Sequence, residues 1–157
     1  MKNILNLTMT ALFFVSFSSC SNNNNSNEVT SVASFSSYLT TYNFFCEGSL
    51  NESDTYSFNG GSFVLTKKDK RSGATRTFNG DYQVKSSKFS DKGTDFYYVT
   101  LDFDNKNYAD KLFFVYWQGF IIKPSAADIY EDQYGIDIKE WHVSLALSYN
   151  KFTPIKK

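Results

Sequence analysis

The sequence predicts a mainly β protein, an antiparallel meander of six to seven strands folded as a small barrel or sandwich, with one or two short helices. Two observations predict this class. Aromatic residues form 18% of the 157 residues, and their flat, bulky side chains suit the pleated surface of a strand. From Thr55 onward, short runs of alternating apolar and polar residues are separated by turns that contain Gly, Asn or Ser.

Composition limits the classes of function. The chain has 16 Lys and Arg against 16 Asp and Glu, so its formal net charge is zero, whereas a nucleic-acid-binding domain is normally basic. The many aromatic residues exclude a disordered chain. One His and two Cys are too few for a zinc site built from these residues, and we expect no metal and no other cofactor.

Residues 1–19 have the pattern of a secretory signal peptide. Lys2 supplies the positive charge, and an apolar-rich segment follows at residues 11–17. This segment is too short for a transmembrane helix, which needs about 20 apolar residues. Ser18 and Ser19 are the small residues expected before a cleavage site. We therefore expect residues 1–19 to be removed from the mature protein.

The segment Phe17-Ser18-Ser19-Cys20 resembles the lipobox of bacterial lipoproteins, in which an aliphatic residue and two small residues precede Cys. Phe17 departs from the aliphatic residue of that pattern. The resemblance covers the first 20 residues. It implies cleavage before Cys20, diacylglycerol on its sulfur and a fatty acid such as palmitate on the new amino terminus. Several acyl chains make a stable anchor, so the implied location is a membrane of the bacterial cell envelope, at the outer membrane or cell surface.

Residues 20–30 follow as a predicted tether that begins with the lipidated Cys20. Residues 21–27 are all Ser or Asn, which cannot bury apolar surface, so we expect this part to be flexible. Residues 31–157 then form a single β-rich globular domain. Cys46 is interpreted as a small buried hydrophobe. A Cys20–Cys46 disulfide is the alternative if Cys20 is not lipidated.

The domain begins with a predicted amphipathic helix between residues 29 and 46. Its apolar residues follow spacings of three and four, as on one face of a helix, and they are Val32, Phe35, Tyr38, Leu39, Tyr42 and Phe45. An irregular first strand is the competing interpretation. After Thr55 the spacing becomes two, and the NGGS segment at residues 59–62, between Phe58 and Phe63, predicts a tight hairpin.

Two further strands are predicted after a polar loop at residues 67–73. The first strand presents Phe78, Gly80, Tyr82 and Val84 on one face. Gly80 within it indicates a bulge or a bend. A second loop is predicted at residues 85–93. The next strand presents Tyr97, Val99, Leu101 and Phe103 on one face.

Residues 112–122 are apolar on both faces, which predicts a central position in the sheet. Gln118-Gly119 either turns this segment into two short strands or bends one long strand. Pro124 ends the segment, because proline lacks the N–H that a strand donates to its neighbour.

A short helix and a final strand complete the predicted elements. Ser125 and Asp128 resemble a capping box ahead of helical spacing in residues 126–134, and Gly135 suits the end of a helix. Residues 141–150 alternate between apolar and small or polar side chains, which predicts a strand with one buried face.

The predicted core takes one face of each strand. Its members are Phe58, Phe63, Tyr82, Leu101, Phe114, Trp141, Val143 and Leu145. If Leu145 belongs to this core, Leu145→Ala destabilises the fold by about 2–5 kcal/mol. Ala146→Ser, on the opposite face of the predicted strand, should have a much smaller effect.

No catalytic residue is predicted. His142 is the only histidine, so any Ser-His or Cys-His nucleophile needs it. A base oriented by Glu140 is one interpretation, and a partly exposed surface histidine is the favoured one. Acidic groups within residues 102–110 and 128–140 are interpreted as solvated, because Lys106 stands where a calcium loop needs a carboxylate. We therefore expect a protein that is not an enzyme.

The predicted function is a lipid-anchored, non-catalytic binding or structural module whose partner is unknown. The alternative is a carrier. Strands at residues 55–103, with an aromatic residue before a Gly-containing hairpin and a Gly-x-Tyr entry to a later strand, resemble small lipocalin-like bacterial lipoproteins. This resemblance implies a barrel that holds a small apolar ligand, and it identifies no functional residue. The expected partners are thus the membrane through Cys20 and a small apolar ligand or a protein.

Two tryptophans are the candidate ligand-binding residues, because binding sites are mostly apolar with a few polar anchors. Trp117 is the better candidate, since it precedes the Gln118-Gly119 turn, where the mouth of a barrel would lie. Trp141 is the second candidate, and its place in the alternating segment favours the core.

Overall fold

The computed structural model describes residues 29–47, 51–105, 112–124, 129–132, 135–146 and 151–157. The predicted signal peptide, Cys20 and most of the tether lie outside the described residues. In chain order the elements are α1 (Val32–Thr41), β1 (Tyr42–Cys46), β2 (Glu52–Asn59), β3 (Ser62–Asp69), β4 (Thr75–Phe89), β5 (Asp95–Phe103), β6 (Leu112–Trp117), β7 (Phe120–Ile122), β8 (Ile129–Asp132), β9 (Gly135–Ile138), α2 (Glu140–Ala146) and β10 (Lys151–Lys156).

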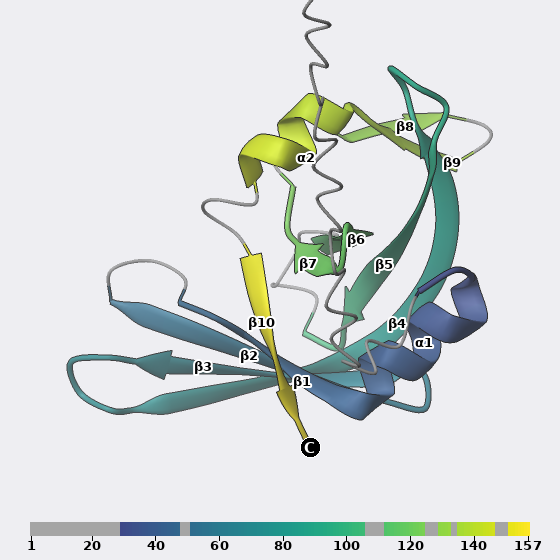
Figure 1. The fold of residues 1–157 in the computed structure, drawn as a ribbon. Coiled ribbons are helices and arrows are strands. Elements are labelled where there is room, and N and C mark those ends of the chain that lie inside the picture. The colour runs from purple at the N-terminus through teal and green to yellow at the C-terminus, as the bar shows by residue number, and fades with distance from the viewer. Residues whose placement is uncertain (1–28, 48–50, 106–111, 125–128, 133–134, 147–150) are drawn as a thin grey trace, which may run out of the picture.

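Eight of these strands close into an antiparallel barrel (Figure 1). Their order around the barrel is β3-β2-β1-β10-β7-β6-β5-β4, and β4 pairs back with β3. The predicted mainly β, antiparallel architecture is confirmed, and the barrel is the correct alternative. The described residues hold a sheet of ten strands rather than six or seven, because residues 112–122 form two strands and β8, β9 and β10 lie where no strand was expected.

β4 is the longest strand that the structure describes, and it closes the barrel by pairing with both β3 and β5. Its residues 75–81 pair with β3 and its residues 80–88 pair with β5, so residues 80–81 have partners on both edges. Beyond Asp81, which pairs with the first residue of β3, the parallel strand β9 pairs with β4 near Phe89. The loop predicted at residues 85–93 is therefore strand as far as Phe89, because β5 and β9 supply backbone partners there.

The predicted hairpin at residues 59–62 is confirmed. Gly60 and Gly61 have φ values of +57° and +96°, a conformation that glycine adopts without strain. Phe58 and Phe63 face each other across the β2–β3 pair and are both buried. The turn thus brings two aromatic rings of neighbouring strands into the barrel.

Aromatic rings fill the barrel interior. Tyr56 of β2 packs edge-on against Phe114 of β6 and Phe152 of β10, with ring centroids 4.8 and 5.5 Å apart. Edge-to-face pairs of this kind contribute about 0.5–1.5 kcal/mol each beyond the area that they bury. Cys46 belongs to the same buried cluster, as predicted. The interior cluster is Val29, Phe35, Tyr38, Leu39, Phe44, Cys46, Tyr56, Phe58, Phe63, Leu65, Tyr82, Val99, Leu101, Phe103, Phe114, Ile121 and Phe152.

α1 supplies the helical part of this interior. Within the predicted segment 29–46, the helix ends at Thr41 and the chain continues directly into β1, so each of the two competing interpretations holds for part of the segment. Ser31 caps the helix, because its Oγ accepts the Ser34 N–H at 3.1 Å while Ser34 Oγ accepts the Ser31 N–H at 2.9 Å. Phe35 and Leu39 are fully buried and join the interior cluster.

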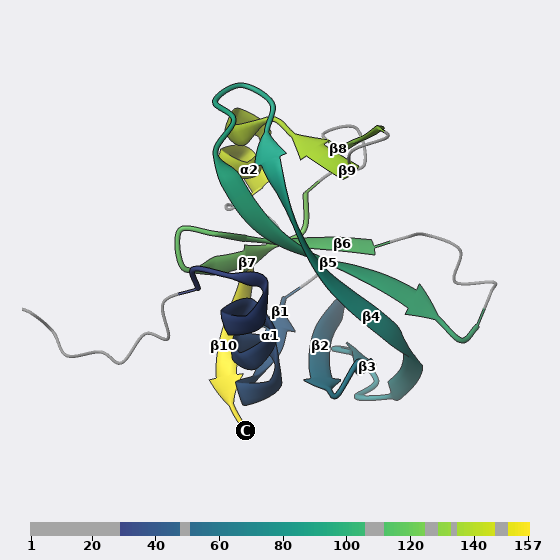
Figure 2. The same cartoon turned by 90° about the vertical axis from the view of Figure 1, so that its right-hand side faces the viewer.

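A second hydrophobic cluster lies on the outer face of the barrel wall. Side chains alternate along β5 and β6, so Val99 and Phe114 point inward while Tyr98 and Val115 point outward. β8, β9 and α2 cover these outward side chains at the end of the barrel opposite α1 (Figure 2). The cluster explains why residues 112–122 are apolar on both faces, and it comprises Phe89, Phe96, Tyr98, Val115, Ile122, Ile136, Ile138 and Val143.

The helix predicted at residues 126–134 is wrong, because β8 begins at Ile129 and pairs with β9. β9 gains backbone hydrogen bonds from β4 and buries Ile136 and Ile138 in the second cluster. These tertiary partners outweigh the local helical spacing. The capping-box residues Ser125 and Asp128 lie outside the described residues.

The strand predicted at residues 141–150 is also wrong, because α2 occupies its first part, and residues 147–150 lie outside the described residues. Residues two apart on a helix point in nearly opposite directions, so alternate side chains cannot share one buried face. Val143 is fully buried, whereas Trp141 is 52% and Leu145 60% exposed. The predicted core is thus wrong for Trp141 and Leu145 and confirmed for Phe58, Phe63, Tyr82, Leu101, Phe114 and Val143. Neither helix in the described part of the chain is long and apolar enough to cross a membrane.

Candidate ligand cleft between Trp117 and Trp141

The centre of the barrel interior is filled by side chains. The space between them is too small to hold a water molecule, and the residues around it are Leu39, Phe44, Tyr56, Phe58, Phe114, Ile121 and Phe152. A barrel that carries a ligand needs an interior cavity of the ligand's size. This part of the interior is a packed core and offers no room for a ligand.

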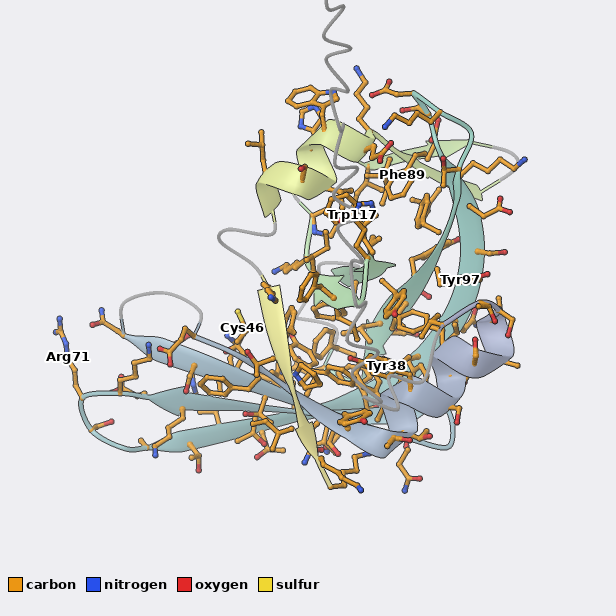
Figure 3. The ribbon with its side chains drawn as sticks, viewed as in Figure 1. Tyr38, Cys46, Arg71, Phe89, Tyr97 and Trp117 are labelled. Carbon is orange, nitrogen blue, oxygen red and sulfur yellow. The ribbon has the colours of Figure 1, made fainter. Side chains whose placement is uncertain are left out.

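An open cleft of about 230 Å³ lies outside the barrel, and both predicted binding residues contribute to it. Its walls are Asp91, Lys92, Trp117, Glu140, Trp141 and Ser144. In Figure 3, Trp117 lies below α2, on the same side of the barrel as Phe89. Three separate elements therefore form the cleft: the β4–β5 turn, the end of β6 and α2.

Trp117 is positioned by the end of β6. Gln118 and Gly119 form a turn with φ values of +47° and +85°, so the two-strand interpretation of residues 112–122 is correct. Neighbouring side chains on a strand point to opposite faces. Because Tyr116 packs against the interior cluster, Trp117 lies on the outer face, where it packs half-buried against the second cluster. The residue is at a strand end, as predicted, but it does not face the barrel lumen.

Backbone contacts between β4 and β9 hold the other two walls together. The Ser90 N–H donates to the Ile138 carbonyl oxygen at 3.0 Å, immediately before the turn that carries Asp91 and Lys92. Within that turn, the Gly93 N–H donates to the Phe89 carbonyl oxygen at 2.7 Å. The start of α2 therefore has a fixed position relative to the turn, although the two are far apart in the sequence.

An ion pair closes the rim of the cleft. Lys92 Nζ lies 2.9 Å from Glu140 Oε2, and the two side chains are 65% and 22% exposed. The contact is electrostatic, because this Glu140 oxygen accepts no well-directed hydrogen bond from the described residues. Because the Lys92 side chain is 65% exposed, solvent screens the pair, and it contributes at most about 1 kcal/mol to stability. Its main effect is to leave Asp91 as the excess charge at the rim.

Two larger grooves flank the β8–β9 hairpin, with volumes of about 460 and 480 Å³. Their walls are mainly polar and exposed side chains of β4 and β5, such as Asp81, Gln83, Lys85 and Asp102. Ligand pockets are lined mainly by apolar and aromatic side chains with a few polar groups. The smaller cleft, which has two indole rings, fits that description better.

Glu140 does not orient His142 in the way that the base interpretation requires. Glu140 and His142 are two residues apart on α2 and point to different sides of the helix, and the His142 ring packs against Trp141. Among the described residues, no three His, Cys, Asp or Glu side chains gather as a metal site would need. That the protein is not an enzyme and needs no cofactor stays a prediction.

Sequence reasoning selected Trp117 and Trp141 separately, and the structure places both on one cleft. It missed Asp91, Lys92 and Ser144 as members of the same site. Lys92 belongs to a Gly-containing turn, which is a visible signal for a loop but not for a ligand site. Its approach to α2 depends on the β4–β9 pairing, which no local pattern predicts.

The fold and the cleft define a small antiparallel β-barrel protein with a candidate ligand site on its outer surface. Comparison with known proteins adds nothing to this class, because no protein-family profile, no curated protein and no solved structure matches the chain.

Proposed function

We propose that this chain is a lipid-anchored binding protein of the bacterial cell envelope that holds a small ligand between Trp117 and Trp141. The proposed anchor is Cys20, at the end of a lipobox-like segment, and residues 20–30 would separate the lipid from the barrel. The proposed location is the outer membrane or the cell surface. The ligand is bound and released without a chemical step.

One observation carries the binding function. Two indole rings from elements that are distant in the sequence line a single cleft together with three charged side chains. Trp141 keeps half of its surface exposed, so apolar contact area remains available to a ligand. An apolar surface with a few polar anchors is the usual composition of a small-molecule site.

The second candidate function, a lipocalin-like carrier with its ligand inside the barrel, has less support. The small barrel is compatible with it. However, the centre of the interior is occupied by packed side chains, and the space between them does not hold a water molecule. An interior ligand would have to displace aromatic rings such as Tyr56 and Phe114, which are in edge-to-face contact.

Anchoring is tested by membrane fractionation of the full chain. Cys20→Ala should move the protein from the membrane to the soluble fraction and should abolish labelling by a fatty-acid analogue, because the acyl chains have no other attachment site. Cys46→Ala is the matched control, since it removes a buried thiol and should keep the label. Labelling of the Cys20→Ala protein would contradict the anchor.

Ligand binding is tested with the full chain in polyoxyethylene-ether micelles and the neutral apolar dye N-phenyl-1-naphthylamine. Binding in the cleft should raise the dye's own fluorescence above its value in micelles, a readout that also works for a variant without tryptophan, since Trp117 and Trp141 are the two tryptophans of the sequence. The Trp117→Phe/Trp141→Ala double variant measures dye uptake by the micelle alone. Equal dye binding by the wild type and the double variant would show that the cleft binds no small apolar molecule.

A further inference from the structure

We infer that the cleft binds a neutral sugar ring, either free or as one unit of a glycan. The inference rests on the proposed binding function and adds the chemical class of the ligand. It follows from the combination of groups in the walls. Trp117 and Trp141 supply flat apolar surface, while Asp91, Lys92 and Glu140 add hydrogen-bond donors and acceptors to the walls.

Other ligand classes fit these walls less well. An apolar ligand such as the dye can contact the indole rings, but it gives Asp91, Lys92 and Glu140 no hydrogen-bond partners, so it should bind more weakly than a sugar ring. A cation would meet the Lys92 ammonium, and an anion would meet two carboxylates. A sugar ring avoids both problems, because its C–H groups form an apolar face and its hydroxyls donate and accept at the edge. The hydroxyl of Ser144 can likewise donate and accept.

The size and openness of the cleft also suit this class. Its volume of about 230 Å³ accommodates one small ring rather than an extended molecule. The cleft opens to solvent, so further units of a glycan can continue outside it. Trp141 is 52% exposed and offers a platform at the entrance, whereas Trp117 is half-buried and forms the firmer wall.

The walls are preorganised, which matters for a ligand that offers little apolar area. Trp117 packs against the second hydrophobic cluster, and the Ser90–Ile138 hydrogen bond fixes the β4–β5 turn beside α2. A site that is already ordered loses less conformational entropy when a ligand binds. Weak individual contacts with hydroxyls and C–H groups can then give measurable affinity.

The test uses the full chain in polyoxyethylene-ether micelles, whose headgroups contain no sugar. One arm titrates neutral monosaccharides by calorimetry, and a second arm measures retardation in native gels that contain soluble neutral polysaccharides. Binding in the first arm identifies free sugars as ligands, and binding in the second arm alone identifies a unit within a glycan. We expect Trp141→Ala to weaken binding by about tenfold or more, because a stacked aromatic contact is lost.

Leu145→Ala is the matched control, because Leu145 lies one turn from Trp141 on the same helix, is similarly exposed and does not line the cleft. It should leave the affinity within about twofold of the wild-type value. Trp117→Phe keeps an aromatic wall and should weaken binding less than Trp141→Ala. Thermal melts of each variant separate loss of binding from loss of folding.

The outcomes distinguish this inference from the proposed function. If no sugar binds while the apolar dye still binds in a manner that depends on Trp117 and Trp141, the sugar class is wrong and the binding function stands. If neither binds, both are wrong. If sugars bind equally well to Trp141→Ala and to the wild type, they bind outside this cleft and the inference is overturned.

Discussion

Phe63 and Phe103 meet ring edge to ring face, with centroids 4.9 Å apart and ring planes at 87°. Gly80 lies between them on β4, because it pairs with Phe63 of β3 on one edge and with Phe103 of β5 on the other. The register of both pairs runs continuously through Gly80, so of the two predicted features, a bulge or a bend, the bulge is absent, and the residue marks a close approach. A Cβ there would lie 2.1 Å from the Asp102 carbonyl oxygen and 2.8 Å from Phe63 Cε1.

Gly80→Ala should therefore destabilise the barrel by at least about 1–3 kcal/mol, the usual effect of overpacking a close-packed interior. Backbone must move, because the nearest atom is a carbonyl oxygen of the neighbouring strand rather than the end of a flexible side chain. Urea unfolding followed by circular dichroism measures the change. Gly60→Asn is the control, since the position is open, its φ of +57° suits Asn, and stability should stay within about 0.5 kcal/mol.

The same substitution at Leu39 and at Leu145 tests which helical residues belong to the core. Both lie on helices, but Leu39 is fully buried and Leu145 is 60% exposed. Leu39→Ala should cost about 2–5 kcal/mol, because it leaves a cavity in the interior cluster. Leu145→Ala should change stability by less than about 0.5 kcal/mol. Equal losses in urea unfolding would mean that α2 buries Leu145 and that residues 141–146 are wrongly placed.

The fold could be predicted where local and tertiary signals agree. The β2–β3 hairpin combines an NGGS turn with alternating Tyr56, Phe58, Phe63 and Leu65, and it is correct. Prediction failed after residue 122, where the second cluster lies outside the barrel. There β9 is a strand because β4 offers it an edge, and α2 is a helix that buries Val143 while Trp141 and Leu145 are exposed. No local pattern in the sequence shows either of these tertiary contacts.

The residues of the candidate site could likewise be predicted only where a local pattern indicates them. Trp117 could be selected from the sequence because it precedes a turn at a strand end, and that turn is present. The alternating neighbours of Trp141 predict a buried strand position, yet a helical backbone turns the side chain toward solvent. Lys92 and Glu140 come together only through the pairing of β4 with β9, so their ion pair needed the tertiary structure.

Asp69, in the turn between β3 and β4, should make the stability of the fold depend on pH in the acid range. Its carboxylate accepts the backbone N–H groups of Ser72 at 2.7 Å and Arg71 at 2.9 Å, together with the Ser72 hydroxyl at 3.0 Å. The Ser72 backbone N–H and then its hydroxyl, with the Arg71 N–H, lower the pKa of Asp69 below the ordinary value of 3.8. The carboxylate therefore stabilises the fold above that value, and this contribution is lost as pH falls through the lowered pKa.

Asp69→Asn should remove this acid dependence, because the amide oxygen still accepts hydrogen bonds but carries no charge. The stability difference between the wild type and Asp69→Asn should be largest above pH 5 and should shrink as pH falls below 4. Urea unfolding at several pH values measures it. A difference that is constant over this range would show that the turn gains nothing from the charge.

Tyr38 links α1 to the barrel and should make stability fall at alkaline pH. Its ring packs against Tyr42 at 5.1 Å, Phe44 at 5.6 Å and Tyr116 at 5.7 Å, between centroids (Figure 3). Burial, followed by the nearby Tyr116 and Tyr42 phenols, raises the pKa of Tyr38 from 10.0 to about 12. The folded state therefore holds the proton over a pH range in which the unfolded chain releases it.

Because the pKa of Tyr38 is higher in the folded protein than in the unfolded chain, stability should fall as pH rises. The neutral Tyr38 phenol stabilises the fold fully below pH 10, and the contribution is lost as pH rises from 10 toward 12. Tyr38→Phe cannot ionise, so the stability of the wild type relative to this variant should be constant up to about pH 9 and should decline above it. Urea unfolding at several alkaline pH values measures the difference. The other tyrosines titrate in both proteins, so their effect cancels in the comparison. If wild type and variant lose stability in parallel up to pH 12, the Tyr38 hydroxyl is solvated and α1 does not pack against the barrel through this ring.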